Sequence, residues 1–155
     1  MDFHTLKAGT LKLASSCEGR VALYIHTEDG FIEKDADAVF SSASLIKVPI
    51  LLAGLLQAEK GLLQLEDEVE VTASARVGGS GVLQAMARDL KIKVTDLLTL
   101  MIIVSDNTAT NLIIELLGME KTNQLIKSLG FNNTSLNRKM MDFEALKKGT
   151  DNTTT

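Results

Sequence analysis

The stretch SLIKVPILLAGLLQAE, residues 44–59, carries the strongest structural signal in the sequence. Its near-continuous apolar character, closed by Gly61, predicts a long buried helix. Pro49 is compatible with a helix that begins near Ser44, because proline fits the first helical turn. Ser44 and Lys47 are three residues apart, so on a helix their side chains share one face. Burial of Lys47 among apolar neighbours would lower its pKa, which lets a lysine act as a general base toward a hydroxyl group.

A second polar cluster, Ser105-Asp106-Asn107, follows the apolar run 97–104 at the junction of two predicted helices. A helix N-cap would account for one of these residues. It does not account for a hydroxyl, a carboxylate and an amide together, 61 positions after Ser44 and with the glycine-rich segment 78–81 between. The two clusters in this order predict an active-site serine acyl-transferase.

Hydrophobic periodicity and turn residues predict the remaining elements. In chain order they are a helix over 6–17, a hairpin of strands 21–25 and 31–33 with a turn at 28–30, an extended stretch 66–72, a short helix 82–87, a helix 96–104 capped by Thr95, a helix from the second cluster to Gly118, and a helix 120–129. These elements indicate an α+β fold in a single, incomplete domain over residues 1–155. Residues 1–36 hold the first helix and the hairpin, and residues 37–155 hold a helical lobe.

The composition argues against several classes of protein, among them nucleic-acid-binding, metal-binding and membrane-spanning proteins. A net charge of -4 and a pI near 5.2 argue against nucleic acid as a partner. Cys17 is the only cysteine, and with His4 and His26 it forms no cluster at metal-ligand spacing, so we expect no disulfide, metal or cofactor. The longest apolar runs are shorter than the roughly 20 residues that span a bilayer. The opening residues lack a secretory signal pattern, so we expect a cytoplasmic protein, or an extracytoplasmic one if Met1 is a processed boundary.

The two clusters also carry a resemblance to a known family. Residues 43–49 (ASLIKVP), 79–83 (GSGVL) and 104–109 (VSDNTA) resemble class A serine β-lactamases and the wider β-lactamase-related serine hydrolases, which include penicillin-binding transpeptidases. The resemblance implies a β-lactamase/transpeptidase-like α+β fold, with the helices in one lobe and the early hairpin at the edge of a sheet. It implies a β-lactam or a related amide or ester as substrate.

The same resemblance assigns roles to five residues. Ser44 would be the acylated nucleophile, and Lys47 and Ser105 its proton network. Asn107 would donate a hydrogen bond to the substrate amide and partner Lys47. Asp106 would be structural and tie its carboxylate to neighbouring backbone.

The sequence departs from the family pattern after the helical lobe. Class A enzymes use a loop glutamate to activate the deacylating water, and Glu144 is the best candidate here, with Asp142 behind it. A solvated acidic residue is an equally good interpretation of Glu144. Enzymes of this family also have a strand with the motif Lys-Thr-Gly or Lys-Ser-Gly, which supplies a backbone N–H to the oxyanion, and this sequence contains neither motif. The loss of one oxyanion donor typically costs about a hundred- to a thousandfold in rate. We therefore expect a C-terminally truncated family member with apolar surface exposed on the hairpin and the first helix.

Three functional hypotheses follow. The first is a serine hydrolase that acts through an acyl-enzyme on Ser44, impaired in isolation by the missing strand. The second is a penicillin-binding protein that is acylated without turnover. The third is a non-catalytic interaction protein that self-associates through its exposed sheet edge.

Overall fold

The computed structural model describes all residues from Met1 to Thr155. Contacts divide the chain into two compact units, residues 1–40 together with Thr155, and residues 41–154. The single domain and its division after residue 36, predicted above, stay predictions. None of the helices combines the length and the apolar character needed to cross a membrane.

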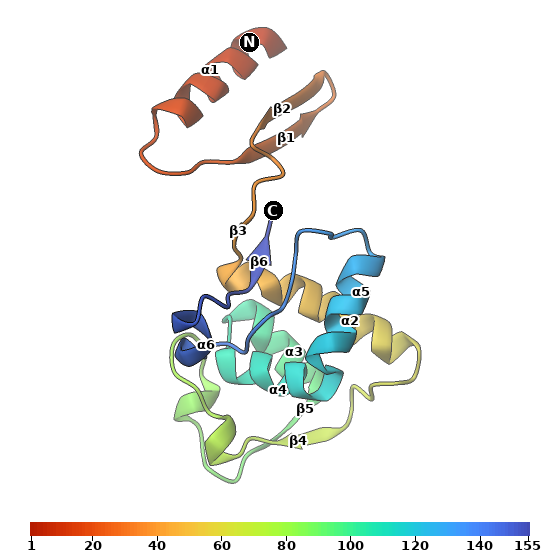
Figure 1. Cartoon of the computed structure of the whole chain (residues 1–155). Helices are drawn as coiled ribbons and strands as arrows, with labels where there is room; N and C mark the ends of the chain where they lie inside the picture. Colours follow the sequence, from red (N-terminus) through yellow and green to blue (C-terminus); the bar gives the residue numbers. More distant parts are fainter. The chain divides into compact units, whose positions relative to one another are not determined.

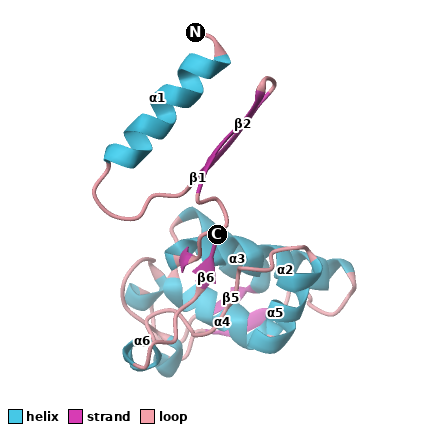
Figure 2. Cartoon of the chain, turned by 45° about the horizontal axis from the view of Figure 1, so that its top comes forward, coloured by secondary structure: helices cyan, strands magenta, loops and turns pink.

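The first unit consists of one helix and one hairpin. Helix α1 (Phe3–Ser16) is capped by Asp2, whose carboxylate accepts a hydrogen bond from the Thr5 N–H. Strands β1 (Leu23–Thr27) and β2 (Gly30–Lys34) pair antiparallel, and Figure 2 shows α1 beside this hairpin. Tyr24 and Phe31 remain 59% and 48% exposed, so the expected apolar surface on the hairpin is present.

The second unit is built around helix α2 (Lys47–Glu59). It packs against α3 (Val94–Ile103), α4 (Asn107–Leu117) and α5 (Met119–Ser128), as Figure 1 shows. The core between these helices is aliphatic, as a sequence almost without aromatic residues requires. Its fully buried side chains include Ile46, Ile50, Leu97, Met101, Ile113 and Leu117.

Short elements connect and cover the helices of the second unit. Strands β4 (Glu68–Glu70) and β5 (Lys91–Lys93) pair antiparallel. The single turns η1 (Ala43–Ile46), η2 (Ala73–Ala75) and η3 (Leu83–Ala85) are 3₁₀ helices. Near the end of the chain lie α6 (Phe143–Lys147) and β6 (Thr153–Thr154), and β6 pairs with β3 (Phe40–Ser41).

The structure confirms the α+β fold and the hairpin, and corrects several details. The helix expected from Ser44 begins at Lys47, after the 3₁₀ turn η1. Thr95 is not a cap, because α3 begins at Val94. The N–H groups of Val94 and Thr95 donate to the carbonyls of Asp67 and Leu65, so backbone satisfies the start of this helix. The helix expected over residues 82–87 is the 3₁₀ turn η3.

Candidate active site

Asp106 fixes the turn between α3 and α4. It is 1% exposed and caps α4, because its Oδ1 accepts from the Ala109 N–H over 2.9 Å. Its Oδ2 accepts from the N–H groups of Val82 and Leu83 over 2.7 and 2.9 Å. The carboxylate therefore ties the start of α4 to the chain before η3. This is the backbone-tying contact that the resemblance implied for Asp106.

Lys47 is buried at the centre of the site. It is 2% exposed, and its Nζ lies 2.7 Å from the Ser105 carbonyl oxygen, 2.8 Å from Ser105 Oγ and 2.9 Å from Asn107 Oδ1. Burial lowers the pKa of Lys47 below its ordinary value, and the negative charge of Asp106 opposes that shift. No carboxylate forms an ion pair with the amine. The site thus favours a neutral lysine more than an exposed surface would.

The hydrogen-bond geometry determines what a neutral Lys47 can do. A neutral amine has two N–H groups and one lone pair. The Ser105 carbonyl and Asn107 Oδ1 can only accept, so they take the two N–H groups. The lone pair is then left for a hydroxyl, and Ser105 Oγ is the nearest one. This is the arrangement of a general base next to a hydroxyl.

Ser44 lies at the other end of this group. Its Oγ lies 3.0 Å from Ser105 Oγ and 3.5 Å from Lys47 Nζ. A proton can therefore pass from Ser44 to Ser105 as Ser105 gives its own to Lys47, with a longer direct path from Ser44 to Lys47. Ser44 is exposed and lies in the 3₁₀ turn η1, where the Leu45 N–H donates to the Ser42 carbonyl over 2.9 Å.

Asn107 forms hydrogen bonds both to Lys47 and to the glycine-rich segment 78–81. Its Nδ2 donates to the Gly78 carbonyl over 3.1 Å, which leaves the second N–H of the amide available to another acceptor. Its backbone N–H donates to the Ser80 carbonyl over 3.0 Å. A Cβ on Gly79, which has a φ of +83°, would lie 2.7 Å from Asn107 Nδ2, so a side chain there would displace the amide.

Backbone strain is concentrated around this group. Only four non-glycine residues have a positive φ, and three of them are Ala43 (43°), Ser105 (54°) and Met141 (63°). Ala43 precedes the nucleophile candidate, and Ser105 belongs to the proton path. Left-handed backbone at such residues costs of order 1–3 kcal/mol each and is typical of functional sites. Nothing in the sequence pattern indicated these conformations.

A closed loop over residues 138–152 lies next to the site, and sequence reasoning missed it. Arg138 forms an ion pair with Asp151 over 2.8 Å at the neck of the loop. Asn152, 2% exposed, accepts from the N–H groups of Asn137 and Arg138 and donates to the Arg138 carbonyl. The one available sequence signal was the pair of opposite charges, 13 residues apart, on either side of a polar segment.

Asn111, one turn after Asn107 on α4, holds the middle of this loop. Its Oδ1 accepts from the Met140 N–H over 2.7 Å, and its Nδ2 donates to the Met140 carbonyl over 3.0 Å. The next side chain, Met141, has its Sδ 3.1 Å from the Cβ position of Gly79. The loop therefore presents Met141 beside Gly79 and the Asn107 amide. The four-residue spacing of two asparagines on one predicted helix face could have indicated this role.

The structure does not bring Glu144 into the hydrogen-bonded group. Glu144 lies in α6, is exposed, and pairs with Lys147 over 2.8 Å. Asp142 caps α6 through the Ala145 N–H. The side-chain hydrogen bonds of Ser44, Lys47, Ser105 and Asn107 involve no carboxylate. The role of Glu144 as a deacylation base stays a prediction.

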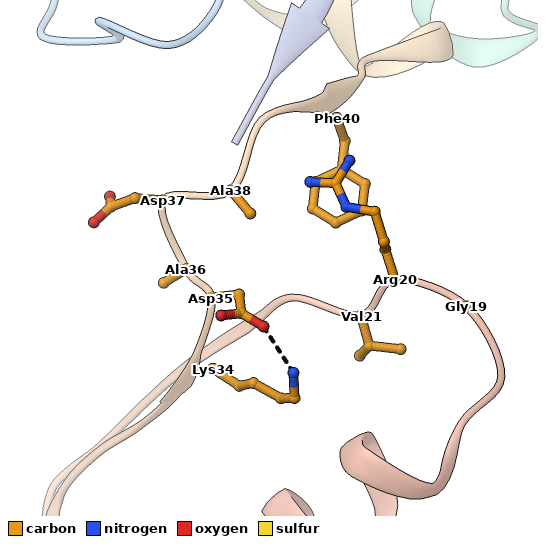
Figure 3. Close-up of a pocket in the computed structure, with 9 residues that line it drawn as sticks. All are labelled: Gly19, Arg20, Val21, Lys34, Asp35, Ala36, Asp37, Ala38 and Phe40. Carbon is orange, nitrogen blue, oxygen red and sulfur yellow. Dashed lines mark hydrogen bonds and ion pairs between the residues drawn. The ribbon is translucent and has the colours of Figure 1, made fainter.

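The first unit contains a separate hollow of about 640 Å³, shown in Figure 3. The guanidinium of Arg20 lies over the Phe40 ring at 4.4 Å, and Lys34 pairs with Asp35 across 2.7 Å. None of the site residues lines this hollow. No group of three or more His, Cys, Asp or Glu side chains is placed to hold a metal ion.

The helical unit and its serine-lysine-serine group define a protein with the β-lactamase-like fold. The family model of the β-lactamase enzyme family, Beta-lactamase2, matches residues 6–155, and the chain belongs to this family.

Solved structures and one curated relative support the assignment. The chain is similar to a β-lactamase from Sphaerobacter thermophilus (33% identity, TM-score 0.89), covering 100% of this chain and 59% of that one. It is similar to PBP-A, solved as a mutant in an acyl-enzyme complex with penicillin G (29% identity, TM-score 0.86), covering 99% of this chain and 58% of that one. The β-lactamase regulatory protein BlaB of Streptomyces cacaoi is 30% identical over 111 residues, 70% of this chain and 35% of the relative. The chain thus spans between about a third and three fifths of these proteins.

Proposed function

We propose that this chain is a serine hydrolase of β-lactamase type that acts by acylation of Ser44. The observation that carries the proposal is the continuous path from Ser44 Oγ through Ser105 Oγ to the buried Nζ of Lys47, with steps of 3.0 and 2.8 Å. Because burial lowers the pKa of Lys47, a neutral amine is available to take the proton that leaves Ser44.

In the proposed acylation, Ser44 Oγ attacks the carbonyl carbon of a β-lactam or a related amide or ester. The hydroxyl proton moves to Ser105 as the Ser105 proton moves to Lys47. Lys47 then returns a proton, by way of Ser105, to the leaving nitrogen or oxygen as its bond to the acyl carbon breaks. The free N–H of the Asn107 amide is placed to bind an acceptor on the substrate. The acyl-enzyme complex of the similar protein PBP-A makes penicillin G the natural probe.

Intact-mass measurement after incubation with penicillin G tests the acylation. We expect one covalent adduct on the wild-type chain, none on Ser44→Ala, and a strongly slowed reaction on Lys47→Ala. Ser16→Ala is the matched control, because the Ser16 hydroxyl is bonded only to the Leu13 carbonyl within α1. An adduct that persists in Ser44→Ala, or no adduct on the wild type, would refute the proposal.

A second candidate function is acylation without useful turnover, and the placement of Glu144 favours it. Hydrolysis of the acyl ester needs a base that activates water, and the carboxylate of Glu144 is exposed and paired with Lys147. An acyl group on Ser44 would then persist, as in a penicillin-binding protein. Time-resolved mass measurement separates the two functions, since turnover regenerates the free chain and persistent acylation does not.

A further inference from the structure

We propose that Arg76 is a positioning residue that orients the Asn107 amide toward the substrate, through the glycine-rich segment 78–81. This inference rests on the proposed acylation and adds a residue outside the hydrogen-bonded group of the site. The guanidinium of Arg76 donates to four backbone carbonyls, which belong to Val71, Leu83, Met86 and Ala87. Arg76 therefore acts on the course of the backbone around it.

The four carbonyls come from both sides of the glycine-rich segment. Nη2 donates to the carbonyl of Val71 over 3.4 Å, before the segment, and to that of Ala87 after it. Nη1 donates to the carbonyls of Leu83 and Met86, the latter over 3.1 Å. One cation thus joins the chain on either side of the segment, by hydrogen bonds that are stronger than those between neutral groups. Without the guanidinium, four carbonyls lose their side-chain partner.

The residues that follow Arg76 contact the candidate site directly. The Val77 N–H donates to Thr108 Oγ1 over 3.1 Å, and Thr108 is 1% exposed. The Gly78 carbonyl accepts from Asn107 Nδ2 over 3.1 Å. Only Val77 lies between Arg76 and the carbonyl that orients the Asn107 amide. The position of that carbonyl therefore depends on Arg76 from one side and on Thr108 from the other.

The Asn107 amide is held at both of its polar atoms. Its Oδ1 accepts from Lys47 Nζ over 2.9 Å, and its Nδ2 donates to the Gly78 carbonyl. If that carbonyl moves, the second N–H of the amide loses its fixed direction toward the substrate. Lys47 keeps its hydrogen bonds to Ser105, so the proton path stays in place. Loss of Arg76 should therefore slow acylation and leave its pH profile unchanged.

Chemical rescue separates this positioning role from a general loss of stability. Acylation by penicillin G is followed by intact mass in the wild type, Arg76→Ala and Arg88→Ala, the last being a control because Arg88 is exposed in the same segment. We expect the second-order rate to fall about tenfold in Arg76→Ala, as for the loss of one hydrogen bond to the substrate. Millimolar guanidinium, far below denaturing concentrations, should restore most of the rate, and urea, which is planar but neutral, should not.

Arg76→Lys keeps the charge but has fewer donors, so its acylation rate should lie between those of the wild type and Arg76→Ala. A wild-type rate in Arg76→Ala, or equal responses of that variant to guanidinium and urea, would overturn the inference. A shifted pH midpoint of acylation would also overturn it, since Arg76 would then act on Lys47.

The NMR signals of the Asn107 side-chain amide distinguish failure of this inference from failure of the proposed function. They are compared in the unacylated wild type, Arg76→Lys and Arg88→Ala. We expect these signals to shift in Arg76→Lys and to stay in place in Arg88→Ala. If the wild type is not acylated but this shift is seen, the proposed function fails while the positioning of the amide by Arg76 stands. Unchanged signals in Arg76→Lys would overturn the positioning itself.

Discussion

Asn111 and Met140 are joined by two hydrogen bonds, with Asn111 Oδ1 accepting from the Met140 N–H and Asn111 Nδ2 donating to the Met140 carbonyl. Asn123 on α5 makes the same pair of bonds with the backbone of Leu136, each of 2.8 Å. The segment that follows α5 is therefore held to α4 and α5 by two matching side-chain clamps. Only the clamp of Asn111 adjoins a residue that lines the candidate site.

The two clamps give a matched pair of substitutions. We expect Asn111→Ala and Asn123→Ala each to lower the free energy of unfolding by about 1–3 kcal/mol, because each leaves a backbone N–H and carbonyl without a side-chain partner. Chemical denaturation measures this loss. Only Asn111→Ala should increase hydrogen exchange at residues 139–142. Faster exchange there in Asn123→Ala alone would contradict this division of roles.

The main helices, and the polar residues 44, 47 and 105–107 that the structure brings together, were predictable because their signals are local. The three-residue spacing of Ser44 and Lys47 predicted that they share one helical face. The cluster at 105–107 was recognisable because three consecutive polar residues follow an apolar run. The four-residue spacing of Asn107 and Asn111 could have indicated that both face the site, but not that Met140, 29 residues further along the chain, is the partner of Asn111. The left-handed backbone conformation of Ala43 and Ser105 could not be predicted from the sequence either, because neither residue type favours it and only the surrounding packing imposes it.

The lowered pKa of Lys47 predicts a pH dependence of acylation. The general base must be neutral, so the acylation rate should rise with pH until Lys47 is deprotonated, at a pH below its ordinary pKa of 10.5. Below that point the rate should fall about tenfold per pH unit, in proportion to the neutral fraction. Rates of acylation by a fluorescent penicillin across pH 5 to 10 measure the profile. A rate that does not change across this range would show that Lys47 is not the base.

The same shift has a consequence for stability. Between the folded and the unfolded pKa of Lys47, the unfolded chain binds more protons than the folded chain, so this residue makes stability rise with pH in that window.

Asp106 raises the pKa of Lys47 by its charge, so Asp106→Asn should lower that pKa further. NMR titration of the Lys47 side chain in wild type and Asp106→Asn checks the sign, and a higher pKa in the variant would contradict it.

Gly81 should tolerate no side chain. It has a φ of +114°, and a Cβ there would lie 2.3 Å from Asp106 Cγ and 2.5 Å from Asp106 Cα. Gly81→Ala should therefore destabilise the chain by more than about 3 kcal/mol, since both the backbone and a buried carboxylate must move. Gly149→Ala is the control, because Gly149 has a φ of +80° with open space around it. We expect Gly149→Ala to lower the free energy of unfolding by about 1 kcal/mol, from backbone strain alone. Similar unfolding free energies for the two variants would rule out the proposed collision with Asp106.

Asp151 should contribute to stability in acid. A hydrogen bond from the Ser41 hydroxyl lowers the pKa of this carboxyl below its ordinary value of 3.8, and Arg138 adds to the shift. A group whose folded pKa is depressed stabilises the fold above its unfolded pKa and loses that contribution as pH falls through the folded pKa. Asp151→Asn should therefore cost about 1–3 kcal/mol at neutral pH and progressively less below pH 4.

Denaturation of wild type and Asp151→Asn between pH 2 and 7 measures this convergence. Asp35→Asn is the control, because the pKa of Asp35 is also lowered, by Lys34, but the pair lies at the surface of the first unit and its effect is screened by water. We expect the Asp35 variant to follow the wild-type curve closely. If the difference between wild type and Asp151→Asn stayed constant down to pH 2, the stabilisation would come from packing of the side chain and not from its charge. The neck of the 138–152 loop would then be held by the neutral hydrogen bonds of Asn152, which do not titrate.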